Sequence, residues 1–252
     1  IVFSDPLFIR TAKGLEPTKR ALELSEPLDN ALRGIQNLLL PPKLDLSELE
    51  ARVCIQTHEF ISATYLPKAL SEINNKAPGI IFDLQEYNEN SYKQLDSNEV
   101  DLVICSGMDA GGHLKQRLLF EEGLCHLLRS NHPALEQWSL KTFFSYPYLK
   151  LSTLKNENDP ILKYAKQNKI KLPKIAMYTQ TLSMQLYFLL ESDAIAVVPE
   201  SLAKRGVQYF GLVKKSCLFD TPKVSVKAIW HERNHNDPLH KWLRESIKSN
   251  DS

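Results

Sequence analysis

The spacing of hydrophobic positions changes along the chain. After Thr18, a residue suited to a helix N-cap, apolar residues recur three and four positions apart, which is the spacing of a helix that packs against a second helix. The positions of this predicted seam are Ala21, Leu24, Leu28, Ala31, Ile35 and Leu38. From Val53 onward, short apolar runs alternate with amphipathic stretches, and this alternation predicts an α/β architecture with a largely parallel sheet.

Two blocks of strands and helices are expected after the seam. The first has strands at 53–56, 80–84 and 101–105 and helices at 61–76 and 91–97. The second has strands at 148–151, 174–178 and 194–198 and helices at 160–169 and 181–190. Two such blocks indicate two subdomains, and the stretch from Pro41 to Glu50 reads as a hinge before them.

The opening residues predict a small hairpin. Apolar residues 7–9 and the segment around Leu15 flank a turn at Lys13-Gly14, which would expose Arg10 and Lys13. Pro27 counts against a long straight helix behind it, because an interior proline costs about 3 kcal/mol, so a kink or two shorter helices are alternatives. An ordinary surface hairpin and a helix packed on its own domain would explain the same pattern.

Composition excludes several classes of protein. A chain of 252 residues with 43% hydrophobic and 24% charged residues is neither disordered nor fibrous and can form two compact units. Its apolar runs are too short to span a membrane. Its start carries no signal sequence, but for an internal start this absence says little about export. A net charge of +1 confines any DNA contact to a local basic patch. That patch consists of Arg10, Lys13, Lys19 and Arg20.

The four cysteines indicate a reducing compartment. Cys54, Cys105, Cys125 and Cys217 lie far apart and form no CxxC pair. We expect buried thiols in a cytoplasmic protein. Oxidant sensing through Cys54 and Cys105 is an alternative, although apolar strands raise the pKa of a thiol and reduce its reactivity.

The chain has no sequence signature of an enzyme. It contains no GxSxG, Walker lysine loop or HExxH pattern, and no strand followed by GxGxxG. His231 and His235 are four apart, with His240 nearby, but the turn-like residues 234–238 argue against a helical metal pair. We therefore expect no catalytic residues, no cofactor and no metal site.

The first residues resemble the wing of the LysR-type transcriptional regulators, which has the form F-x-D-P-L-F-x-R-T-x-x-G-x-x-x-T and precedes a long linker helix. The matching residues are Phe3, Asp5, Pro6, Leu7, Phe8, Arg10, Thr11, Gly14 and Thr18. Because the chain begins inside this motif, we expect the helix-turn-helix to be missing from it. The resemblance implies contacts to DNA phosphates, but not to bases, from Arg10, Thr11, Lys13 and Thr18.

Later segments extend the resemblance over essentially the whole chain. The family pattern is matched at Pro67, A-P-G-I (77–80), D-L-V-I (101–104), N-H-P-A-L (131–135), Trp230-His231 and residues 237–244. The last of these look most like regulators of nodulation and aromatic-compound catabolism. The resemblance implies a two-lobed effector domain similar to type 2 periplasmic binding proteins. The implied divisions are a wing remnant at 1–17, a linker and dimerisation helix at 18–40, a hinge at 41–49, and an effector-binding domain at 50–252. Within that domain, lobe I covers about 50–123 and 227–252, and lobe II covers about 124–226.

An effector site is expected where strands end in the cleft between the lobes. The candidate residues are Thr57, His58, Glu59, Cys105, Ser106, Ser152, Thr153, Thr179, Gln180 and Pro199. Such groups suit a small carboxylate or phenol, although the hydroxyl residues could instead cap the following helices. Glu59 would repel an anion unless it pairs with a cation or points away.

The resemblance therefore implies a cytoplasmic, DNA-binding transcriptional regulator that a small molecule controls. Its expected partners are DNA, an effector such as an aromatic or carboxylic acid, further copies of the chain in a homodimer or homotetramer, and RNA polymerase. A small-molecule-binding module without DNA binding is the alternative, and an enzyme on the same fold ranks third.

Overall fold

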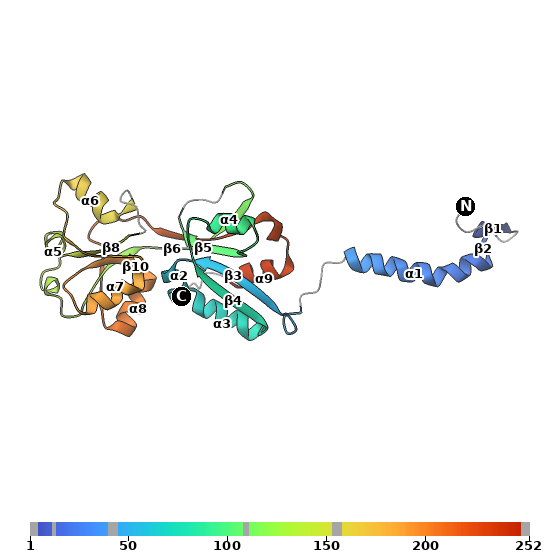
Figure 1. The fold of residues 1–252 in the computed structure, drawn as a ribbon, viewed down its shortest axis with the longest axis horizontal. Helices are drawn as coiled ribbons and strands as arrows, with labels where there is room; N and C mark the ends of the chain where they lie inside the picture. Colours follow the sequence, from blue (N-terminus) through green and yellow to red (C-terminus); the bar gives the residue numbers. More distant parts are fainter. Residues whose placement is uncertain (1–4, 12–13, 40–44, 108–110, 153–157, 248–252) are drawn as a thin grey trace. The chain divides into compact units, whose positions relative to one another are not determined.

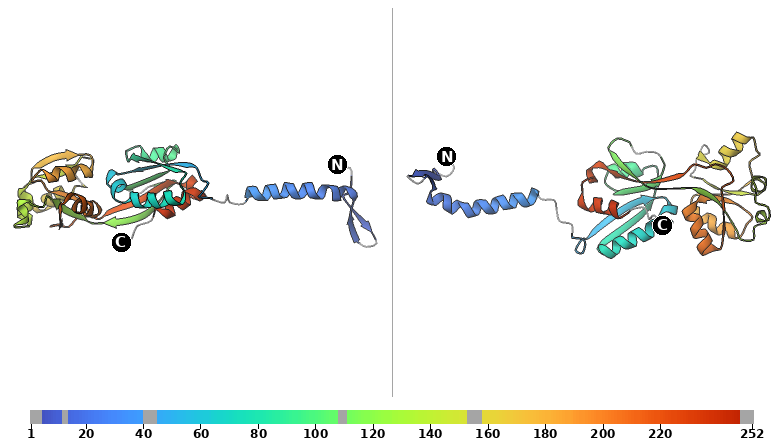
Figure 2. Two further views of the ribbon diagram at one scale, coloured as in Figure 1. Left: turned by 90° about the horizontal axis from the view of Figure 1, so that it is seen from below. Right: turned by 180° about the vertical axis from the view of Figure 1, so that it is seen from behind.

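The structure, a computed structural model, describes residues 5–11, 14–39, 45–107, 111–152 and 158–247. The chain forms two compact units, Ile1–Leu44 and Asp45–Ser252, and each is described by itself. Figures 1 and 2 show the helices and strands of both units.

The first unit begins with the predicted hairpin. Strands β1 (Phe8–Thr11) and β2 (Gly14–Pro17) pair antiparallel. Helix α1 (Lys19–Leu39) follows, and the amide of Ala21 donates to the hydroxyl oxygen of Thr18 at 3.1 Å, which confirms the predicted N-cap. The same hydroxyl donates to the carboxylate of Asp5 at 2.7 Å, so Asp5 fixes the start of the helix to the hairpin.

Helix α1 continues through Pro27 as one element. The ring removes one hydrogen bond without ending the helix, so the alternative of two shorter helices is wrong. Four of its large apolar side chains are 48–63% exposed in this chain, namely Leu22, Leu28, Leu32 and Ile35. Leu28, Leu32 and Ile35 share one face of the helix, because they are spaced four and three positions apart, so the first unit leaves an apolar stripe exposed there. Leu22 lies on another face. The side chain of Leu38 lies outside the described residues.

Lobe I of the second unit is built on a five-stranded sheet of order β4-β3-β5-β12-β6 (Figure 1). Strands β3 (Ala51–Thr57), β4 (Ile80–Glu86) and β5 (Leu102–Ser106) are parallel. Strand β12 (Val224–His231) runs antiparallel to both β5 and β6 (Leu114–Glu122). We expected a largely parallel sheet, but this sheet is mixed. Strand β6 carries the chain to lobe II and β12 brings it back, so no crossover helix on the sheet connects them as it would connect parallel strands.

The helices of lobe I cover both faces of this sheet. Helices α2 (Glu59–Thr64), α3 (Leu66–Lys76) and α9 (Pro238–Ser246) contribute to one apolar core, and α4 (Ser91–Asp96) packs on a separate cluster with Cys54 and Cys105. The single helix expected at 61–76 is wrong. Pro67 has no N–H to donate to the carbonyl of Ala63, so the chain forms two helices that meet at Tyr65.

Lobe II contains two small sheets. Strand β7 (Leu124–Leu128) lies between β10 (Ala196–Pro199) and β11 (Val213–Ser216), antiparallel to both. Strands β8 (Tyr148–Leu151) and β9 (Ile175–Thr179) pair in parallel. The helices of lobe II are α5 (Leu140–Ser145), α6 (Pro160–Asn168), α7 (Leu182–Leu190) and α8 (Glu200–Phe210), and a 3-10 turn, η1, covers Pro133–Leu135. A second 3-10 turn, η3 (Glu232–Asn234), follows β12 of lobe I.

The two lobes share one apolar core. A single cluster includes Ile55 and Ile61 of lobe I together with Leu127 and Leu186 of lobe II. Helix α2 of lobe I contacts α7 and α8 of lobe II. Of the helices in the described parts, none has the length and hydropathy needed to cross a bilayer.

Candidate functional site

The backbone passes between the lobes at two neighbouring places. Gly123 separates β6 of lobe I from β7 of lobe II, and its carbonyl accepts the amide of Glu200 at 3.1 Å. On its return, Val224 pairs with Glu122, one residue before that glycine. The strand ends predicted to bind an effector lie in the lobes joined by these crossings.

In lobe I, the strand ends bring an imidazole and two phenols together. The carbonyl of Thr57, at the end of β3, accepts the amide of Tyr87 at 3.0 Å. The next residue, His58, meets the Tyr87 ring edge-on with centroids 4.8 Å apart, and Tyr87 lies 6.2 Å from the ring of Tyr92. Burial lowers the pKa of His58, partly offset by a hydrogen bond with the backbone of Ser106. A neutral imidazole therefore lies in an aromatic cluster.

Cys105 belongs to the core behind this cluster. Its thiol lies 3.9 Å from the Tyr92 hydroxyl, and it is buried with Cys54 beneath α4. Burial raises the pKa of both thiols. The thiolate, which is the reactive species, is therefore disfavoured at both positions. Cys125 is also buried, whereas Cys217 is partly exposed.

In lobe II, the predicted hydroxyl groups bond to nearby backbone. The Ser152 hydroxyl donates to the carbonyl of Thr179 at 2.8 Å. The Thr179 hydroxyl donates to the carbonyl of Thr181 at 2.9 Å and accepts the amide of Thr181 at 3.3 Å. These contacts join the ends of β8 and β9 to the start of α7. Pro199 precedes α8, Gln180 is exposed, and Thr153 lies outside the described residues.

Two carboxylates accept hydrogen bonds from amides in the first turns of α7 and α8, and a third lies close to the start of α2. Glu59 accepts the amide of Ser183 at 3.3 Å, which joins lobe I to the first turn of α7. Glu122 accepts the amide and hydroxyl of Ser201 in α8 at 2.7 and 3.0 Å. Burial raises the pKa of Glu86, and the backbone of Glu59 at the start of α2 partly offsets this effect. Such carboxylates offset the positive end of a helix dipole, so Glu59 points toward α7 and acts as an internal anion.

Sequence reasoning missed Tyr87, Tyr92, Glu86 and Glu122. A weak signal was present for Tyr87, because it lies three positions after the predicted strand at 80–84. For Glu122 there was none. Its partner Ser201 lies 79 positions away, and no local pattern relates the two residues.

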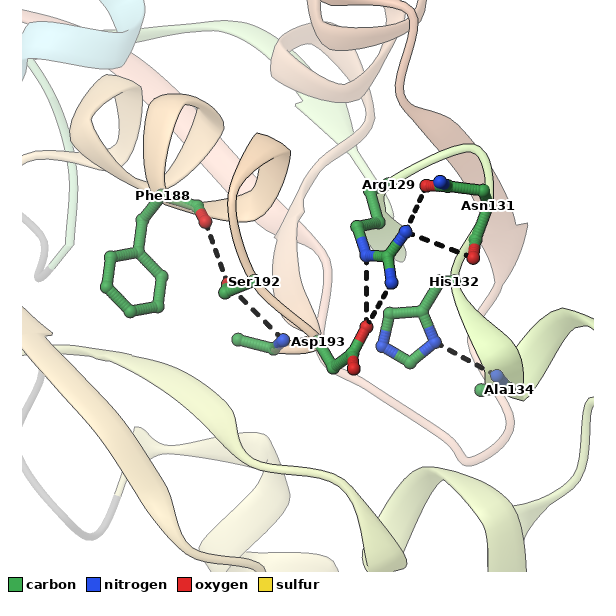
Figure 3. A network of polar contacts seen from close by, with 8 residues as sticks. Arg129, Asn131, His132, Ala134, Phe188, Ser192 and Asp193 are labelled. Atoms are coloured by element: carbon green, nitrogen blue, oxygen red, sulfur yellow. Dashed lines mark hydrogen bonds and ion pairs between the residues drawn. The ribbon is translucent and has the colours of Figure 1, made fainter.

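The N-H-P-A-L segment organises a turn in lobe II (Figure 3). Arg129, after β7, donates from Nε and Nη2 to Asp193 at 3.0 and 2.6 Å and from Nη1 to the carbonyl of Asn131 at 3.1 Å. His132 Nδ1 accepts the amide of Ala134 at 3.0 Å. These contacts tie the end of β7 to the segment between α7 and β10, which gives the motif a structural role.

The residues expected to contact DNA lie in the hairpin and at the start of α1. Arg10 is exposed on β1, the Thr11 hydroxyl donates to the carbonyl of Gly14 at 3.2 Å, and Thr18 caps α1. Lys13 lies outside the described residues. The hairpin thus presents Arg10 to solvent, whereas the two threonine hydroxyls also stabilise local structure.

The histidines near the C-terminus do not form a helical pair. His231 Nδ1 accepts the amide of Arg233, His235 stacks on Trp230, and His240 is buried with Nε2 2.8 Å from the carbonyl oxygen of Asp101. This agrees with the turn expected at 234–238. His231 lies instead beside Asp96 and His113, residues that the sequence did not connect with it.

Comparison with known proteins decides the family. The family model described as LysR substrate binding domain matches residues 47–252. The chain belongs to the LysR-type transcriptional regulators. It is 31% identical to the HTH-type transcriptional regulator SyrM 1 of Sinorhizobium fredii over 98% of this chain and 72% of that protein. It is 26% identical to the HTH-type transcriptional activator NahR of Pseudomonas putida over 96% of this chain and 81% of that protein.

A solved structure of the family has the same fold. Full-length CbnR, crystallised with its target DNA, matches with a TM-score of 0.63 and 14% identity, over 97% of this chain and 83% of CbnR. The predicted family and two-lobed effector domain are confirmed. SyrM 1 and NahR are both named as transcriptional regulators.

Proposed function

We propose that this LysR-type regulator controls transcription in response to an uncharged aromatic effector that binds at the strand ends between its two lobes. The observation that carries the proposal is the pair of carboxylates, Glu59 and Glu122, that accept amides at the N-termini of α7 and α8. Free amides at a helix N-terminus attract anions. In this chain those amides already have an anionic partner, so a carboxylate effector would compete with Glu59 and be repelled by it.

The aromatic character of the effector follows from lobe I. His58, Tyr87 and Tyr92 form a chain of ring contacts beside the ends of β3 and β5. Aromatic rings pack edge-on or offset against one another, and phenol hydroxyls and a neutral imidazole supply directional hydrogen bonds. A benzene ring that carries hydroxyl groups fits this chemistry better than an aliphatic dicarboxylate. Thr57 and Ser106 in lobe I and Ser152, Thr179 and Gln180 in lobe II are proposed to surround it, whereas Cys105 lies in the core behind the rings.

DNA binding is proposed for the same regulator as a homodimer in the cytoplasm. Arg10, Thr11, Lys13 and Thr18 would contact phosphates. The solved structure of CbnR with its target DNA supports DNA as the partner. The exposed stripe on α1 supports pairing of two chains through that helix. Assembly into a tetramer and contact with RNA polymerase are extensions of this proposal.

The test is DNA protection by the full-length regulator on its own promoter region, with catechol, phenol, benzoate or no ligand. We expect protection of a paired site that weakens steeply with salt and changes with catechol or phenol at lower concentrations than with benzoate. Protection that responds only to benzoate would refute the effector class. Ligand binding without any DNA protection would refute the regulator function for this protein.

A further inference from the structure

Three residues with metal-binding side chains meet on the surface of lobe I, apart from the proposed effector site. Asp96 ends α4, His113 immediately precedes β6, and His231 ends β12. One ligand atom from each lies within 4.8 Å of the others. His113 Nε2 is 2.6 Å and His231 Nε2 is 4.0 Å from Asp96 Oδ1.

The backbone around these residues is held by the sheet. His231 pairs with Leu114 across β12 and β6, and the amide of Glu232 donates to the carbonyl of His113 at 3.0 Å. Arg233 Nη2 donates to the carbonyl of Asp96 at 2.5 Å. Three segments far apart in sequence are therefore fixed beside one another, as a preorganised site requires.

We propose that Asp96, His113 and His231 bind a divalent transition-metal ion of the zinc class. Two imidazole nitrogens and one carboxylate oxygen, with water in a fourth position, form an established type of tetrahedral zinc coordination. With metal–ligand bonds of roughly 2.0–2.1 Å, the ligand atoms of a tetrahedron lie about 3.3 Å apart. That separation falls between the 2.6 Å and 4.0 Å observed to Asp96 Oδ1. Small side-chain rotations are sufficient to complete the site.

Arg233 opposes metal binding at this site. Its amide and its Nε both donate to His231 Nδ1 at 3.0 Å, so the neutral ring carries its proton on Nε2. A metal on Nε2 shifts that proton to Nδ1 and displaces both donors. The guanidinium also repels a dication. Removal of the Arg233 side chain is therefore expected to strengthen metal binding, although Arg233 is not a ligand.

The test is isothermal titration of the full 252-residue chain with zinc chloride, in a buffer that does not chelate metals. We expect one ion per chain, with at least ~10-fold weaker binding in His113→Ala and in Asp96→Asn and tighter binding in Arg233→Ala. His235→Ala and Cys217→Ser are matched controls, because one removes a nearby exposed imidazole and the other a partly exposed thiol. Neither should change the affinity.

Cobalt provides a second measurement that does not depend on heats of binding. A tetrahedral Co²⁺ ion bound by the chain should give intense visible absorption bands, which His113→Ala and Asp96→Asn should lose while their thermal unfolding stays unchanged. The proposal is overturned if the chain binds neither ion saturably, or if both variants bind zinc as tightly as the unchanged chain. Zinc binding by His231→Ala that is as tight as in the unchanged chain would overturn ligation through His231 Nε2.

Discussion

Glu59 illustrates how a single side chain changes the chemistry expected of a site. From the sequence, a carboxylate beside the strand ends repels an anionic ligand unless something compensates its charge. In the structure, the charge of Glu59 is compensated by a hydrogen bond from the amide of Ser183, at the start of α7 in the other lobe. No sequence pattern could reveal this contact, because the two residues lie 124 positions apart. Glu59 consequently joins the two lobes through this hydrogen bond and also adds a negative charge at the junction between them.

Replacement of Glu59 tests this interlobe contact. Glu59→Gln should lower the free energy of unfolding by about 1 kcal/mol, because it removes a charge from a helix N-terminus and weakens one hydrogen bond. The measurement is urea unfolding followed by circular dichroism. Glu72→Gln, which changes an exposed carboxylate on α3, is the matched control and should have little effect. Equal stability of the two variants would contradict the assigned role.

His126 provides a prediction about pH. Its ring is buried among Trp138, Phe143 and Phe219, its Nε2 accepts the amide of Leu218 at 3.3 Å, and burial lowers its pKa to about 4. The unfolded chain binds a proton on this histidine below about pH 6.5, whereas the folded chain does not. The free energy of unfolding should therefore fall by up to about 3 kcal/mol between pH 6.5 and 4, and His126 should add no pH dependence above pH 6.5.

Urea unfolding at pH 7 and pH 5 measures the effect. The unchanged chain should lose more stability between these values than His126→Asn, whose side chain does not titrate in this range. As a direct check, the imidazole signals of His126 in an NMR titration should stay those of the neutral ring down to about pH 5. A midpoint near 6.5 would contradict the prediction.

Individual helices and strands were the most predictable features, because their signals are local. The runs at 53–56, 80–84 and 101–105 became β3, β4 and β5, and Thr18 opens α1 as expected. The partners of each strand in the sheet were harder to predict from the sequence. The antiparallel position of β12 between β5 and β6 depends on residues about a hundred positions apart, and periodicity carries no information about such partners.

The turn between α3 and β4 depends on a glycine of the A-P-G-I segment. A Cβ on Gly79 would lie 2.4 Å from the carbonyl oxygen of Leu49, so a side chain there forces the backbone apart. Gly79→Ala should lower the free energy of unfolding by about 1–3 kcal/mol in urea titrations. Gly111→Ala, where nothing lies within 4 Å of the new Cβ, should change it little. Similar losses in both variants would be inconsistent with this steric argument.

The α1 helix should hold two chains together. Leu28→Lys or Ile35→Glu places a charge in the exposed apolar stripe and should abolish dimerisation in sedimentation-velocity experiments. Asn30→Lys, on another face of the helix, is the control and should stay dimeric. Circular dichroism should show that Asp45–Ser252 remains folded in all three variants. A dimer that persists in both stripe variants would rule out this helix as the interface.

At the scale of the whole molecule, the shared core predicts how the second unit unfolds. Because one apolar cluster runs from Ile55 in lobe I to Leu186 in lobe II, the lobes should unfold in a single cooperative transition. Fluorescence of a Trp138→Phe variant reports on lobe I through Trp230 and Trp242, whereas far-UV circular dichroism reports on both lobes. The two urea transitions should coincide, and separate midpoints would show that the lobes unfold independently.

The return of the chain from lobe II has a consequence for synthesis on the ribosome. Lobe I begins first but needs β12 to fill the place between β5 and β6, and α9 to cover its core. Until residue 231 has emerged, a nascent chain carries a completed lobe II beside a lobe I with two unpaired strand edges. The unpaired N–H and C=O groups of such edges can form hydrogen bonds with strands of other chains. Premature termination before Val224 should therefore yield aggregated or degraded fragments, even though most of the sequence has been translated.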